Sequence, residues 1–205
     1  MFPFEIAPGT TIDQLLNDVL PSTHSKLVKP DEAGAFEIGV KVSPGQRWVL
    51  SVDKNLLTTR EGGTTTPIWV HLEEKAVVFF LDDMATTKRF VPKFVPEGGF
   101  TMLTDPRVLK RVSMVSGKIQ IKLVDSPIGT ISLYVAAGAK AKEGLYADDP
   151  DAVLEVHMPT VEKILAGKLG PEAALTDGSV TIKGKRLVAM QFALAIAPFF
   201  KPPPM

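Results

Sequence analysis

The last third of the chain constrains the fold more than any other stretch. Residues 151–158 favour a strand, 159–176 a helix, 177–184 a second strand and 185–197 a second helix. The apolar face of each helical pattern is wide, and the segment holds no nucleophile, base or metal-ligand cluster of known spacing. A segment of this kind is typical of a pocket that holds an apolar molecule rather than one that reacts with it.

Charge and cysteine content exclude several classes of function. The 205 residues fit one domain or two small ones, and the 23 Lys and Arg balance the 23 Asp and Glu. This balance gives no overall field toward nucleic acid or an anionic membrane, so we expect no nucleic-acid partner. The absence of cysteine removes disulfides, thiolate metal sites and cysteine nucleophiles.

The hydropathy of the chain predicts a soluble protein. Residues 1–9 lack the basic start and apolar run of a signal peptide. The longest apolar runs, 76–81 and 192–200, are far shorter than the roughly 20 residues of a membrane span. Together with the missing cysteine, these observations lead us to expect a cytoplasmic location.

The first half has a mixed pattern of helix and strands. Residues 10–20 have helical spacing with Pro21 as the expected end, whereas 56–66 are rich in Thr and Gly and predict a loop. Strands are predicted at Ala35–Val42, Arg47–Val52 and Pro67–Leu72, the first two as a hairpin. Residues 75–81 have the β-branched and aromatic content of a strand, but their place in the repeat described next favours a helix, which we expect.

The second half repeats the order of the first. A predicted hairpin at 118–123 and 130–135 has a Ser-Pro turn like that of the first hairpin, and Val156-His157-Met158 corresponds to Val70-His71-Leu72. The order is kept at a near-constant offset, which indicates a tandem duplication; the alternative is that any two mixed segments of this length share such an order. We therefore divide the chain into a lead-in helix (1–34), a diverged repeat (35–116), a better-preserved repeat (117–200) and a tail (201–205).

Residues 151–192 resemble the sterol carrier protein type 2 family. The resemblance rests on Asp151-Ala152, Met158, Gly167-Lys168-Leu169 with Pro171 and Ala174, and on Gly178, Ile182, Gly184, Ala189 and Met190. Gly170 and Leu175 depart from the usual Asn and Phe, and the Trp of the family's second strand is absent here, although Trp48 stands at that place in the first half. These departures put a second lipid site in the first half in doubt.

The resemblance implies an α+β fold with a mixed β-sheet and helices on one face, present here in two tandem copies. It also implies non-covalent binding and transfer of a sterol, fatty acyl chain or related lipid in an apolar tunnel, without cofactor or metal. The partner would be this hydrophobic small molecule, with transient membrane contact and a homodimer as further possibilities. The residues expected to line the tunnel are Met158, Ile164, Leu165, Leu169, Leu175, Leu187, Met190, Phe192, Leu194 and Phe199.

Two other functions stay open from the sequence. In the first, the same cavity holds a hydrophobic substrate and His71 or His157 acts as the acid or base, although a solvated histidine at a strand end is the simpler interpretation. In the second, the apolar helix at 187–200 is an accessory or dimerisation surface, because a helix that is apolar on all sides must be covered on all sides. The acidic pairs at 82–83 and 148–149 are expected to be solvated loop charges.

Overall fold

The computed structural model describes residues 6–27, 36–43, 45–53, 56–62, 66–87, 106–138, 141 and 149–196. Its helices, in chain order, are α1 (Ile12–Gln14), the π-helix η1 (Leu15–Val19), α2 (Leu20–Leu27), α3 (Glu74–Ala85), α5 (Pro106–Met114), α7 (Met158–Leu165), α8 (Pro171–Thr176) and α9 (Arg186–Ile196). Its strands are β1 (Phe36–Ser43), β2 (Gln46–Asp53), β3 (Leu56–Glu61), β4 (Ile68–Glu73), β5 (Gly117–Val124), β6 (Ile131–Ala137), β7 (Ala152–His157) and β8 (Val180–Gly184).

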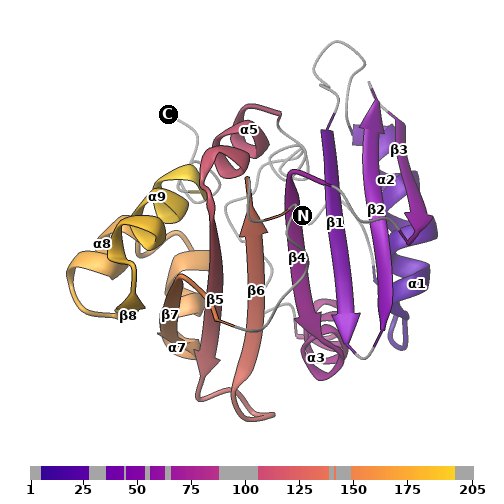
Figure 1. Ribbon diagram of the computed structural model, residues 1–205. Helices are drawn as coiled ribbons and strands as arrows, with labels where there is room; N and C mark the ends of the chain where they lie inside the picture. The colour runs from indigo at the N-terminus through magenta and orange to yellow at the C-terminus, as the bar shows by residue number, and fades with distance from the viewer. Residues whose placement is uncertain are drawn as a thin grey trace.

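All eight described strands belong to one sheet. Their order is β3-β2-β1-β4-β6-β5-β7-β8, so the strands of the first half lie on one side of the sheet and those of the second half on the other (Figure 1). The pairs β1–β4 and β5–β7 are parallel, and the other neighbours are antiparallel. The α+β fold with a mixed sheet, predicted from the sequence, is therefore confirmed.

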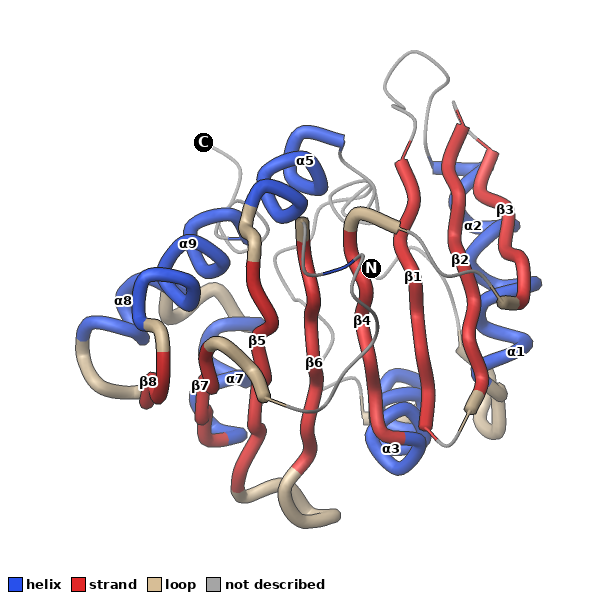
Figure 2. The backbone as a smooth tube through the Cα atoms, viewed as in Figure 1, coloured by secondary structure: helices blue, strands red, loops and turns tan. Residues whose placement is uncertain are grey.

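One face of this sheet carries the hydrophobic core. Ile119 lies opposite Val135 on one side and Ala152 on the other, so the three side chains share a face, and all three are buried. Helices α3, α5, α7, α8 and α9 contribute buried side chains to the same core, and Val77 and Leu81 of α3 pack with Trp48 in a second cluster. Figure 2 shows α1 and α2 at one end of the sheet and α8 and α9 at the other.

The opposite face of the sheet holds a small buried cluster around Trp69. Its members are Val49, Trp69, Ala136 and Ala141. Trp69 lies directly over Gly39 of the neighbouring strand: a Cβ added at Gly39 would stand 2.0 Å from Cε3 and 2.2 Å from Cδ2 of the indole. The glycine in the middle of β1 is therefore required by the close approach of the indole ring.

Both halves contain a hairpin, a parallel strand and a helix in the same order. In each, an antiparallel hairpin precedes a strand that lies parallel to the hairpin's first strand and leads directly into a helix: β1-β2-β4-α3 and β5-β6-β7-α7. The first half differs by strand β3, which lies between β2 and β4 in the chain. The helix expected at residues 75–81 is confirmed as part of α3. The repeated order favours the duplication, which stays a prediction, as do the four domain limits; the sheet itself continues across the boundary between 116 and 117.

Three local predictions are wrong. The helix does not end at Pro21: η1 runs directly into α2, which continues to Leu27, so the proline follows a π-helical turn inside one continuous helical segment. Residues 56–61 form β3 rather than a loop, with Leu57 buried and the β-branched Thr58 and Thr59 paired to β2.

The third concerns the helix predicted over 159–176, which is two helices. The first, α7, ends with Ala166 as its C-cap, and Gly167 follows with a φ of +69°, a conformation that glycine adopts without strain. Pro171 then starts α8 at a position that suits proline. The break turns the chain so that both helices pack against the core.

Candidate ligand-binding site

Helix α9 is the central element of the predicted site, and its first turn is tied to the start of β7. The backbone N–H of Lys185 donates to the carbonyl oxygen of Asp151 at 2.7 Å, and the Lys185 ammonium lies 2.6 Å from Asp151 Oδ1. Asp151 Oδ2 also accepts from the backbone N–H of Lys118 at 3.0 Å, which connects the same carboxylate to β5. The hydrogen bond and the negative charge of Asp151 raise the pKa of Lys185, so this ion pair persists over the neutral range.

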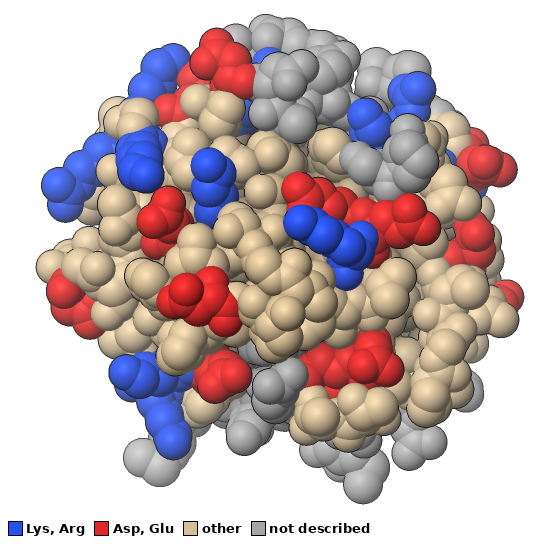
Figure 3. Space-filling view, turned by 90° about the horizontal axis from the view of Figure 1, so that it is seen from below, with Lys and Arg blue, Asp and Glu red and all other residues tan. Residues whose placement is uncertain are grey.

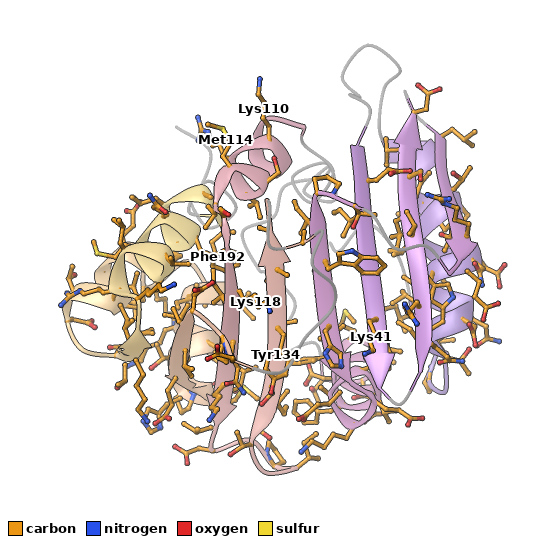
Figure 4. The ribbon with its side chains drawn as sticks, in the orientation of Figure 1. Lys41, Lys110, Met114, Lys118, Tyr134 and Phe192 are labelled. Carbon is orange, nitrogen blue, oxygen red and sulfur yellow. The ribbon has the colours of Figure 1, made fainter. Side chains whose placement is uncertain are left out.

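The inner side of α9 packs on the sheet through small side chains and one large one. Ala189, Ala193 and Ala195 are buried, and Phe192 is 5% exposed. Figure 4 shows Phe192 between α9 and β5. One phenyl ring and three methyl groups therefore supply much of the contact between the helix and the core.

The outer side of α9 is an exposed apolar stripe. Leu187, Met190 and Leu194 are 68%, 39% and 56% exposed, and their spacing of three and four residues puts them on one side of the helix. We call these three residues the outer stripe. Beside it, Leu175 of α8 and Ile182 of β8 border a hollow of about 80 Å³ together with Met190 and Leu194.

The residues predicted to line a tunnel thus fall into two groups. Met158 and Phe192 are buried in the core, and Ile164, Leu165, Leu169 and Leu175 are partly buried against it. Leu187, Met190 and Leu194 face outward, with only Leu175 meeting them at the hollow. Phe199 lies outside the described residues.

A larger groove, of about 950 Å³, lies elsewhere and contains none of the predicted residues. It runs between the N-terminal segment 9–13, helix α3 and the tip of the β5–β6 hairpin at Ile128. Sequence reasoning missed it because the residues that line the groove come from segments far apart in the chain, at 9–13, at 42 and 46, at 74–82 and at 128. The signal that was available is the apolar run from Ala76 to Leu81, which covers more than one side of a helix; Val78 in this run is 61% exposed.

The two candidate acid–base histidines lie apart from both cavities. His157 is exposed, and its Nδ1 lies 2.5 Å from Asp125 Oδ2. His71 is buried on the face of the sheet opposite the main core, stacked on Tyr134 with 5.5 Å between ring centres. They are not equivalent positions, because His71 stands three residues before α3 begins whereas His157 immediately precedes α7.

His71 lies in a row of polar side chains that crosses the middle of the sheet. Lys41 and Tyr134 are its neighbours on β1 and β6, and Gln120 donates to the Tyr134 hydroxyl at 2.8 Å (Figure 4). Burial lowers the pKa of His71 from its usual 6.5, and the charge of Lys41 lowers it further, while Glu73 acts in the opposite sense. The neutral imidazole is therefore the form that the folded protein favours.

The lowered pKa of His71 predicts a pH-dependent stability. Because the unfolded chain binds this proton at a higher pH than the folded chain, the free energy of unfolding should fall as pH falls from 6.5 through the folded pKa. His71→Phe, which keeps a ring against Tyr134, should lose less stability than the native protein between about pH 7.5 and about pH 5.5 in urea unfolding. Equal slopes in the native protein and in His71→Phe would contradict the assignment to His71.

The described residues include no metal site and no membrane-spanning helix. No group of three or more His, Asp or Glu in the described ranges is arranged to hold a metal ion. Within the same ranges, every helix is too short or too polar to cross a bilayer.

Comparison with known proteins gives one family model that matches the second half of the chain. Residues 101–196, a little under half of the sequence, match the model of the SCP-2 sterol transfer family. The resemblance predicted from residues 151–192 is therefore confirmed, and the match extends upstream over α5, β5 and β6. No curated protein matches the chain.

Solved sterol carrier structures are similar to part of the chain. They include sterol carrier protein domain 2 of Helicoverpa armigera, with 24% identity over 51% of this chain and 84% of that one, at a TM-score of 0.36. Sterol carrier protein 2 from Yarrowia lipolytica has 22% identity over 55% and 94%, at 0.32. Palmitated SCP2L2 from Aedes aegypti has 19% identity over 44% and 91%, at 0.33.

Proposed function

Because residues 101–196 match the SCP-2 sterol transfer family, we propose that this protein binds and transfers a hydrophobic ligand without a chemical step. The ligand class is a sterol, a fatty acyl chain or a related lipid. The site is the region where α9 meets α8, β8 and the core of the second half. Of the residues predicted from the sequence to line a tunnel, Leu175, Met190 and Leu194 border the hollow in this region.

The outer stripe is the observation that carries the proposal. Leu187, Met190 and Leu194 are large apolar side chains that protrude from one helix inside the matched region, whereas an ordinary surface helix exposes charged and polar residues there. Methionine adapts its shape to different apolar partners, which suits a site for variable lipids. Met190 and Leu194 of the stripe border the hollow together with Leu175 and Ile182, so a ligand there would meet apolar surface from three elements.

The size of the hollow requires α9 to move when the ligand enters. Pockets for small molecules usually measure about 300 to 1,000 Å³, and the hollow beside the outer stripe has about 80 Å³. Lys185 and Asp151 fix the N-terminal end of α9 by a backbone hydrogen bond and an ion pair. We infer that α9 turns outward about this end and that the ligand takes the space its C-terminal half leaves beside Leu175 and Ile182.

The energy of such binding is sufficient without a charged contact. At ~25 cal/mol per Å², covering about 300 Å² of apolar ligand surface contributes on the order of 7 kcal/mol before the costs of association. The free energy needed to move α9 offsets part of this contribution. We therefore expect affinities in the micromolar range and rapid release, as a transfer function requires.

Replacing the outer stripe should abolish ligand binding while the fold remains intact. In the variant Leu187→Ser, Met190→Ser, Leu194→Ser, every changed side chain is at least 39% exposed, so the core is untouched. We expect affinity for palmitate and cholesterol to fall at least about tenfold, because three apolar contacts of roughly 0.5–1 kcal/mol each are lost. Displacement of a fluorescent fatty acid measures the effect.

Leu56→Ser is the matched control, since Leu56 is 58% exposed on β3 at the far end of the sheet. It should bind palmitate as the native protein does. Unchanged lipid affinity in the triple variant would contradict the proposed site. If the triple variant instead converts a dimer to a monomer in sedimentation experiments, with no lipid bound by either protein, the dimerisation function is favoured.

A further inference from the structure

The groove beside α3 is formed by parts of both halves of the molecule. One wall is the N-terminal segment 9–13, which a capping box holds in place: Thr11 and Gln14 exchange hydrogen bonds of 2.9 and 3.2 Å. The other wall is α3, and Ile128 at the β5–β6 turn closes one end. Lys75 of α3 donates to the carbonyl oxygen of Thr130 at 3.0 Å, which fixes α3 to this turn.

The floor of the groove is apolar and partly open to solvent. Side chains from β1, α1 and α3 line it, and they are Ile12, Val42, Val77, Phe79 and Leu81. Val78 and Ile128 border the groove from different elements and are 61% and 39% exposed. An exposed apolar surface in a concave setting of about 950 Å³ is within the size range of ligand sites.

The charges at the rim are mainly acidic. Asp13, Glu74 and Asp82 line the groove with exposed carboxylates, and Lys75 is the one basic residue among the described lining residues. The Lys75 ammonium is already engaged, 3.3 Å from Glu73 Oε2 and hydrogen-bonded to Thr130. No ion pair of the three rim carboxylates occurs within the described part of the chain. Figure 3 views this end of the molecule and shows uncharged surface between groups of acidic side chains.

We propose that this groove is a second binding site, for a cationic amphiphile: a molecule with an alkyl chain or fused-ring body and an amine or quaternary ammonium head. The apolar body lies on Val77, Val78 and Leu81, and the head meets the carboxylates of Glu74 and Asp82 or of Asp13. An anionic lipid of the same length is disfavoured, because three carboxylates repel its head and the single ammonium is occupied. The site is independent of α9 and of the function proposed there.

A pair of ligands that differ only in the head group tests this proposal. Hexadecylamine and hexadecanoate are titrated into the whole protein below their micelle concentrations, by calorimetry and by amide chemical shifts. We expect the amine to bind at least about fivefold more tightly than hexadecanoate, with chemical-shift changes at residues 9–13 and 74–82. Its affinity should fall as the salt concentration is raised from about 50 to about 500 mM.

Three variants locate the binding. Glu74→Gln with Asp82→Asn should weaken binding of the amine about fivefold, because its charged head loses two partners. The same variant should not weaken hexadecanoate, because repulsion of its carboxylate is reduced. Val78→Ser with Ile128→Ser should weaken binding of the amine, because its alkyl chain loses two apolar contacts. Both positions are exposed, so the fold should tolerate the change. Leu56→Ser, at an exposed position on β3 that lines neither cavity, is the control and should leave binding of the amine unaffected.

The proposal is overturned if the two ligands bind at the groove with equal affinity, as measured by the shifts of residues 9–13 and 74–82. It is also overturned if the amine changes shifts only on α8 and α9, or if Leu194→Ser weakens the amine as much as the groove variants do. If binding of hexadecanoate, which is palmitate, depends on the outer stripe and not on the groove, the result does not contradict this proposal. Failure of the lipid site on α9 is therefore distinguishable from failure of the groove site.

Discussion

Phe192→Asp should lower the free energy of unfolding by at least about 4 kcal/mol. Removing a buried phenyl ring alone costs roughly 3–5 kcal/mol, and the aspartate adds the cost of placing a carboxylate among apolar side chains. Phe192 is 5% exposed and belongs to the main core cluster. Since whole domains are stable by about 5–15 kcal/mol, we expect this variant to be largely unfolded at 37 °C by circular dichroism.

Leu194→Asp is the matched control for this prediction. It makes the same kind of change two residues further along α9, at a side chain that is 56% exposed, so stability should change by about 0.5 kcal/mol or less. If Phe192→Asp were as stable as Leu194→Asp, the inner side of α9 would not be packed as described. Phe192 is for this reason a poor position for testing ligand binding, since loss of the ligand would follow from loss of the fold.

Local patterns predicted most of the fold correctly. The hairpins β1–β2 and β5–β6 were predicted from the alternation of apolar and polar residues and from turns that contain Ser and Pro. Both signals lie within about 20 residues of chain, because the strand register and the turn type depend on nearby residues. The order strand, helix, strand, helix in the last third is also confirmed, apart from the break at Gly167. These signals are local, and they do not depend on what the segment later contacts.

Contacts distant in sequence account for what was missed. Strand β3 has a Thr-rich sequence that suits a loop as well as a strand, and it becomes a strand because β2 offers it a free edge. The same holds for α9: its sequence is apolar on all sides, so periodicity cannot distinguish Phe192, which faces the core, from Leu194, which faces outward. The resemblance to the family indicated that this helix belongs to the binding site, but it did not indicate which side of the helix packs against the core.

Gly39→Ala should lower the free energy of unfolding by about 3 kcal/mol, at the upper end of the cost of overpacking. The new methyl group would stand between 2.0 and 2.3 Å from three ring atoms of Trp69, and that indole is 1% exposed and packed against Val49 and Ala136. The indole ring cannot move away without disrupting this cluster. We therefore expect the new methyl group to distort the pairing of β1 with β4. Urea unfolding measures the change.

A double-mutant cycle with Trp69 separates this clash from the general cost of changing a glycine. In a Trp69→Leu background the space above Gly39 is open, and Gly39→Ala should then cost less than about 1 kcal/mol, a coupling of about 2 kcal/mol between the two positions. Gly45→Ala is the control for backbone effects, because a Cβ there meets nothing within 4 Å. If Gly39→Ala costs the same in both backgrounds, the glycine is needed for its backbone and not for the indole, and the packing of Trp69 on β1 is refuted.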